Sequence, residues 1–179
     1  MNAGLLKGSA ALGICLLLWG CSAQTPEPDG KIVREKLQGG YQTTTKVKYQ
    51  ELEATMTIYQ PPMNCAQVVF DSPPSLQNLK MTFFTDRTKL EYEGKSFEFS
   101  AGSLPSKAAA QLVISALNAV TQDQGITVRQ QDDKLVIQGE LADGSFSLEA
   151  DGKSGNLLTL SIPERELELE ILDFHILEE

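Results

Sequence analysis

The sequence has few of the residues on which most catalytic sites depend. His175 is the single histidine among 179 residues, and three cysteines are present. Catalytic triads, Cys–His pairs and multi-histidine metal centres therefore have almost no raw material. Asp173 would share a strand face with His175, but no serine or cysteine is near them in sequence to complete a triad. We expect His175 to lie at the rim of the fold, near the C-terminus. We also expect no metal or cofactor, and a protein that is not an enzyme.

Positive charge is also scarce. The chain has 15 lysines and arginines against 24 acidic residues, which gives a net charge of −9. This balance argues against nucleic acid as a partner and against electrostatic docking on anionic lipid headgroups. Any affinity for a membrane must come from another source.

The only long apolar run lies near the start, at residues 10–19, and follows Lys7. It has the length of a secretion signal and is too short to cross a bilayer, which takes about 20 residues. Leu18-Trp19-Gly20-Cys21 resembles the lipobox of bacterial lipoproteins, in which the chain is cut after the residue corresponding to Gly20 and the cysteine receives lipid. The alternative is an ordinary signal peptide cut near Ala23, with Cys21 incidental.

The lipobox interpretation predicts three segments: a signal peptide at 1–20, a lipidated tether at 21–30 and a folded domain at 31–179. The tether has two prolines and small polar residues, without periodicity. The protein would be exported and held by lipid, such as palmitate, on the outer face of the cell membrane. In a cell with two membranes, Ser22 favours the outer one.

Cysteine use follows from the same interpretation. Cys15 leaves with the signal and Cys21 is lipidated, so Cys65 has no partner for an intrachain disulfide. We expect Cys65 to be buried and the core alone to stabilise the fold.

Apolar periodicity predicts a mainly β, α+β domain. Two helices are expected, a short one at Asp29–Leu37 and a longer one at Ser106–Gln122, which Pro105 begins and Gly125 ends. Residues 41–59 read as one long strand with a bulge or bend around Gln50–Glu51, where the apolar parity changes. Further strands are expected at 66–70, 80–85, 89–93, 96–100, 126–130, 134–140, 144–150, 156–162 and 164–177.

The last of these strands has alternating glutamates from Glu164 to Glu170 on one face and Leu167, Leu169 and Ile171 on the other. A solvated face is the better interpretation of the acidic row, since calcium requires oxygens that converge from a compact loop. Past Ile171 the apolar parity changes again, which predicts a bend that places the following apolar residues on another part of the core.

The element order and several short motifs resemble the Lol-type lipoprotein carrier and acceptor family and its lipoprotein relatives in spore-forming Gram-positive bacteria. The motifs are Val68-Val69-Phe70-Asp71-Ser72-Pro73, Leu90-Glu91-Tyr92-Glu93-Gly94, Leu104-Pro105 and Ile171-Leu172-Asp173-Phe174. The resemblance implies a single, strongly curved antiparallel sheet that forms an incomplete β-barrel packed on a helix. Carriers hold acyl chains in the barrel, and some relatives in spore formers act as non-catalytic partners of cell-wall enzymes.

Such a fold would turn one set of apolar residues inward, either as a filled core or as the lining of a lipid cavity. Candidates for apolar ligand binding are Met56, Ile58, Phe70, Phe83, Leu112, Leu117 and Phe146, and Val69, Leu90, Phe97, Leu148, Leu160 and Leu169 are expected inside as well. A filled core is favoured, because protein interiors pack densely. Two functions stay open: an anchored interaction module for an envelope protein, such as a cell-wall or germination enzyme, and a binder of lipid or lipoprotein acyl chains.

Overall fold

The computed structural model describes residues 30–62, 65–100, 103, 108–142 and 144–177. The signal, the lipobox, most of the tether and the expected helix start at Pro105–Ser106 lie outside these residues. The helices are α1 (Lys31–Gln38), α2 (Ala109–Gln122) and the 3₁₀ helix η1 (Pro163–Arg165). The strands are β1 (Tyr41–Tyr49), β2 (Leu52–Gln60), β3 (Ala66–Ser72), β4 (Lys80–Phe83), β5 (Arg87–Tyr92), β6 (Lys95–Ser100), β7 (Ile126–Gln131), β8 (Lys134–Leu141), β9 (Gly144–Asp151), β10 (Leu157–Ile162) and β11 (Leu167–Ile176).

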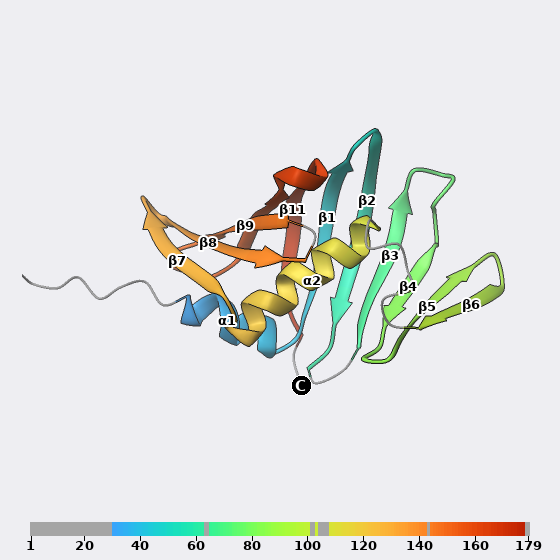
Figure 1. Cartoon of the computed structure of the whole chain (residues 1–179), viewed down its shortest axis with the longest axis horizontal. Coiled ribbons are helices and arrows are strands. Elements are labelled where there is room, and N and C mark those ends of the chain that lie inside the picture. Colours follow the sequence, from blue (N-terminus) through green and yellow to red (C-terminus); the bar gives the residue numbers. More distant parts are fainter. Residues whose placement is uncertain (1–29, 63–64, 101–102, 104–107, 143, 178–179) are drawn as a thin grey trace, which may run out of the picture.

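All of these strands belong to one antiparallel sheet. Its order is β6-β5-β4-β3-β2-β1-β11-β10-β9-β8-β7, so two meanders of consecutive strands meet where the first strand pairs with the last. The sheet curves around α2, and its two ends, β6 and β7, stay apart (Figure 1). The expected incomplete barrel packed on a helix is confirmed.

The segment from Tyr41 to Gln60 is a hairpin and not the single bulged strand that we expected. Strands β1 and β2 pair along their whole length; for example, Val47 lies opposite Ala54 and Thr45 lies opposite Met56. Residues directly opposite each other in a hairpin point to the same face of the sheet. With a two-residue turn, buried odd-numbered residues of β1 therefore lie opposite buried even-numbered residues of β2. The change of parity at Gln50–Glu51 is therefore the signature of the turn.

Gln50 has a positive φ of 54° at the first position of this turn, where glycine is the least strained residue. We expect Gln50→Gly to raise the free energy of unfolding by up to about 1 kcal/mol. Urea unfolding of the two proteins measures this difference. Glu51→Gly, at a turn position without a positive φ, is the control and should destabilise slightly; equal effects at both positions would contradict the strain argument.

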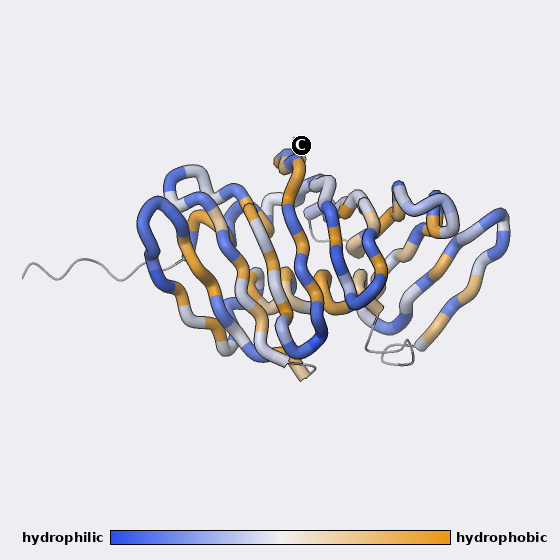
Figure 2. Tube along the Cα trace, turned by 90° about the horizontal axis from the view of Figure 1, so that it is seen from above, coloured by the Kyte–Doolittle hydropathy of each residue, from blue (hydrophilic) through white to orange (hydrophobic). Residues whose placement is uncertain are grey.

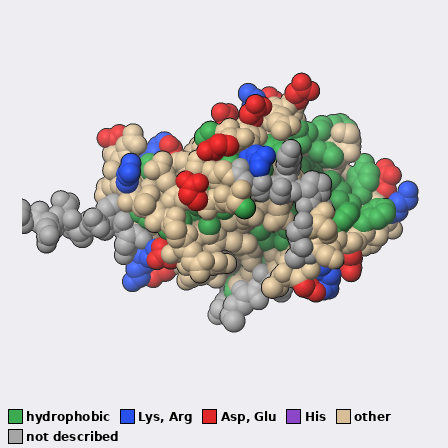
Figure 3. Space-filling model, viewed as in Figure 1, with side chains coloured by type: hydrophobic (Ala, Val, Ile, Leu, Met, Phe, Trp, Pro, Cys, Tyr) green, Lys and Arg blue, Asp and Glu red, His purple; other side chains and the backbone are tan. Residues whose placement is uncertain are grey.

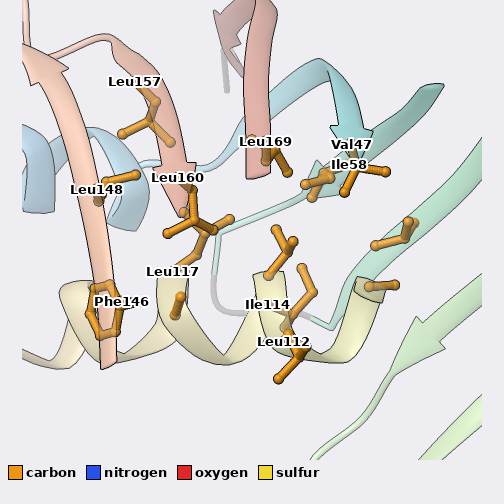
Figure 4. Packing of buried hydrophobic residues seen from close by; sticks show 14 of the residues in the cluster. Val47, Ile58, Leu112, Ile114, Leu117, Phe146, Leu148, Leu157, Leu160 and Leu169 are labelled. Atoms are coloured by element: carbon orange, nitrogen blue, oxygen red, sulfur yellow. The ribbon is translucent and has the colours of Figure 1, made fainter. Parts of the chain in front are cut away.

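Helix α2 lies along the concave face of the sheet and supplies its central packing. Its sequence places apolar residues three and four apart, and eight of its side chains are buried, among them Leu112, Ile114 and Leu117. They pack against Phe146, Leu148, Leu160, Leu169, Val47 and Ile58 from strands on both sides of the β1–β11 junction (Figure 4). Helix α1 contributes Val33 and Leu37 to the same core, and an ion pair of 2.7 Å joins Arg34 to Asp123 just after α2.

The last strand starts later than expected. Pro163–Arg165 forms a 3₁₀ turn and Glu166 has a positive φ, so the expectation that Glu164 and Glu166 lie on the strand is wrong. Glu168 and Glu170 do lie on its exposed face, opposite buried Leu167 and Leu169.

The parity change past Ile171 coincides with an irregularity in the β1–β11 register. Leu172 has no partner in that register and is 54% exposed, and Ile176 is exposed too. Only Phe174 of the three apolar residues returns to the core, where its ring stacks on Tyr41 with the centroids 5.5 Å apart. The expected bend is present as a bulge, but it buries one side chain and not three.

Hydropathy alternates along most strands of the sheet, as expected for a surface with one wet and one packed side (Figure 2). Among the described residues, no helix combines the length and apolar character that crossing a membrane requires.

Candidate apolar binding surface

The seven residues predicted to bind an apolar ligand all lie in one core. Met56, Ile58, Phe70 and Phe83 come from β2, β3 and β4, Leu112 and Leu117 from α2, and Phe146 from β9. Each is at most 9% exposed, and Met56 and Ile58 are fully covered. The structure therefore brings the predicted residues together as neighbours in a packed interior. An acyl chain would reach Met56 and Ile58 only if the side chains packed around them moved.

The apolar concave face continues beyond the cover of α2. One cross-strand row runs from Ile58 through Val68, Met81 and Leu90 to Phe97, because each residue pairs with the next on the neighbouring strand. Along it the side chains change from buried in β2, β3 and β4 to partly exposed at Leu90 and 52% exposed at Phe97. The same apolar lining thus passes from core to surface.

A second row parallels the first. It joins Ala66, Phe83, Thr88 and Phe99, which are buried except for Phe99 at its end. Leu90, Phe97 and Phe99 therefore lie on one face of the β5–β6 hairpin, and we call these three side chains the open apolar surface. Figure 3, in the orientation of Figure 1, shows hydrophobic side chains gathered at this end of the molecule.

The opposite face of the same hairpin is charged. Lys80 and Lys89 approach Glu91 at 2.9 and 3.0 Å. Hydrogen bonds from these two lysines, more than their charge, hold the pKa of the Glu91 carboxyl below its usual value. The hairpin is thus amphipathic: its outer side carries ion-paired, hydrated side chains, and its inner side presents an apolar face.

Three residues expected inside lie outside the core: Val69, Leu90 and Phe97. Phe97 is exposed because the sheet extends past α2, which the local sequence of β6 does not reveal. Val69 is on the outer face, since it pairs with Lys80 and alternates with buried Val68. The sequence analysis did not predict the open apolar surface. Alternation identified which face of β5 and β6 is apolar, but it does not show how far along the sheet α2 extends.

The remaining chemistry-bearing residues are at the surface. His175 Nε2 lies 2.7 Å from Asp173 Oδ2, and both side chains are exposed, as expected for a rim histidine. Cys65 is partly exposed, so the expectation of a buried thiol is wrong. Within the described ranges, no group of three or more His, Cys, Asp and Glu side chains is arranged to hold a metal ion.

No protein-family model and no curated protein matches the sequence. An uncharacterised conserved protein from Thermus thermophilus has a similar solved structure, with a TM-score of 0.56 and 12% identity over 84% of this chain and 86% of that one. This likeness shows a shared fold alone. Like the fold that the sequence resemblance implied, the sheet is open, curved and packed on a helix.

Two further solved structures are similar to a lesser degree. A LolA superfamily protein from Nitrosomonas europaea has a TM-score of 0.41 and 8% identity, over 84% of this chain and 94% of that one. A chain from the complex of the CwlD amidase with the GerS lipoprotein of Clostridioides difficile has a TM-score of 0.43 and 11% identity, over 78% and 84%. The function of this chain has to be argued from its own residues.

Proposed function

We propose that this chain is a lipid-anchored, non-catalytic interaction module of the cell envelope that binds a partner protein through the open apolar surface. The observation that carries the proposal is the row from Ile58 to Phe97, which leaves the core and ends in solvent. Burying a phenylalanine or leucine side chain is worth about 1.5–3 kcal/mol. A partner that covers the row would gain that energy, and contiguous exposed apolar side chains typically mark such sites.

The anchor comes from the sequence. A lipidated Cys21 and a tether of nine residues, 22–30, would hold the domain within about 30 Å of the membrane surface, since an extended chain spans at most about 3.3–3.6 Å per residue. The partner would then be another component of the envelope. Cell-wall enzymes are the class to screen first, because the family that the sequence resembles includes partners of such enzymes.

Substitution of Phe97 tests the proposal. We expect Phe97→Ser to weaken capture of the partner from envelope extracts at least about tenfold, since central aromatic side chains dominate protein interfaces. Quantitative pull-down with the wild-type and variant proteins measures the loss. Tyr59→Ser, at another exposed aromatic side chain on the other face of the sheet, is the matched control. Equal loss, or no loss, in both variants would refute the assignment of the site.

A second candidate function is the binding of a lipid acyl chain, which the continuity of the open apolar surface with the core under α2 favours. Native mass spectrometry of the chain from Ser22 onward, purified without detergent, separates the two. A lipid-sized mass that denaturation removes would support the acyl-chain binder. A clean apo mass together with partner capture would support the interaction module.

A further inference from the structure

A pocket of about 360 Å³ lies away from the open apolar surface, between both helices and the first hairpin. It is lined by the end of α1, the start of β1, the end of β2 and the last turns of α2. Sites for small molecules usually measure about 300–1,000 Å³. This pocket is therefore large enough for a small ligand and independent of the surface proposed above.

The lining is polar but carries no formal charge. It includes the carboxamides of Gln38, Gln60 and Asn118 and the hydroxyls of Thr121 and Tyr41. By contrast, two hollows on the outer face of the sheet are lined by lysines and glutamates. A charged ligand would lose hydration in this pocket without gaining a counter-ion, so the lining selects a neutral one.

Tyr41 gives the pocket a hydroxyl group. Its side chain is largely buried, its ring is stacked on Phe174, and it forms part of the pocket wall. Burial raises the pKa of this hydroxyl well above its ordinary value, so it stays protonated and can donate. A ligand in the pocket could therefore accept a hydrogen bond from this hydroxyl.

Other groups around Tyr41 are fixed in place with hydrogen-bonding capacity to spare. Gln38 Nε2 donates to the carbonyl of Thr121 at 3.3 Å, and the Thr121 hydroxyl donates to the carbonyl of Leu117 at 2.8 Å. These bonds leave the carboxamide oxygen of Gln38 and the hydroxyl oxygen of Thr121 able to accept.

Apolar contact completes the pocket, since Leu37 and Pro61 lie in its wall beside the polar groups. A sugar ring matches this mixture: it is neutral, presents several hydroxyls and has apolar C–H faces. We propose that the pocket binds a neutral saccharide unit, such as one from an envelope glycan.

Titration of the full chain in detergent micelles with N,N′,N″-triacetylchitotriose, and separately with maltotriose, tests this proposal. We expect saturable binding of at least one sugar with a Kd below about 1 mM, measured by calorimetry and by saturation-transfer NMR. Tyr41→Phe keeps the ring and its stacking and should weaken binding about tenfold through the lost hydrogen bond. Asn118→Leu, at an exposed helix position, should weaken it similarly without affecting the core.

Tyr59→Phe, outside the pocket, is the matched control and should bind as the wild type does. If neither sugar binds saturably at concentrations up to about 10 mM, ten times the expected upper limit of the Kd, the proposal is overturned. Binding that neither Tyr41→Phe nor Asn118→Leu weakens would overturn it too. Phe97→Ser should leave sugar binding unchanged, so failure here and failure of the proposed partner surface are distinguishable.

Discussion

Replacing Cys21 with serine is expected to reduce incorporation of labelled palmitate to background. The thiol is the attachment point for lipid in the lipobox interpretation, and a hydroxyl does not replace it as the nucleophile that is modified. Each buried methylene contributes about 0.8 kcal/mol to membrane affinity, and two or more acyl chains give stable anchoring. If Cys21 is lipidated, replacing one sulfur atom by oxygen would thus remove the whole lipid anchor.

Growth with labelled palmitate, followed by intact-mass measurement of the purified protein, measures this effect. Cys65→Ser is the matched control, because it removes the other thiol of the mature chain, and it should retain full labelling. If the wild-type protein were unlabelled and began near Ser22–Gln24, the chain would have an ordinary signal peptide and the anchor would be disproved.

We expect Phe146→Ala to lower the free energy of unfolding by about 3–5 kcal/mol, a large part of the stability of a domain of this size. Phe146 is 2% exposed and pairs across β8–β9 with Gly139, whose missing side chain makes room for the ring. A Cβ added at Gly139 would lie 2.6 Å from Phe146 Cε1. The ring therefore fills a site shaped around it, and its loss leaves a cavity.

Equilibrium urea unfolding measures this cost, with Phe97→Ala as the control. Phe97→Ala, at an exposed side chain, should change the free energy of unfolding by no more than about 0.5 kcal/mol. Gly139→Ala alone should also lower the free energy of unfolding, because the added methyl group clashes with the Phe146 ring. The same substitution should cost less in a protein that already carries Phe146→Ala, because the ring is then absent. A cost below about 1 kcal/mol for Phe146→Ala would show that the interior is loosely filled, which would favour the lipid-binding alternative.

Much of the fold follows from local patterns. Alternation identified the strands at β3, β5, β6, β8 and β9 nearly to the residue, because each has one packed and one wet face. The helical spacing of Leu112, Val113, Ala116 and Val120 located α2 in the same way. These features depend only on which side of an element is buried, and sequence periodicity reports that directly.

Other features depend on contacts between distant segments, and the sequence did not reveal them. A bulge and a two-residue hairpin both reverse the parity of a strand, so Gln50–Glu51 was assigned to the wrong one of the two. Phe97 and Phe146 have similar alternating surroundings in sequence, yet α2 covers only Phe146. The candidate surface exists because a helix ends before a sheet does, and no local pattern encodes that difference in length. The Tyr41 pocket is similar, since its lining combines residues from four elements.

The pairing of β1 with β11 also bears on how the chain folds as it is made. The strand that begins the sheet obtains its second neighbour only when the last ten-residue strand has been synthesised. Until then the growing polypeptide has two meanders, each with an unpaired central edge strand that can pair wrongly. Contacts between residues so distant along the chain form slowly. Premature termination before residue 167 would leave the two meanders without the strand that joins them.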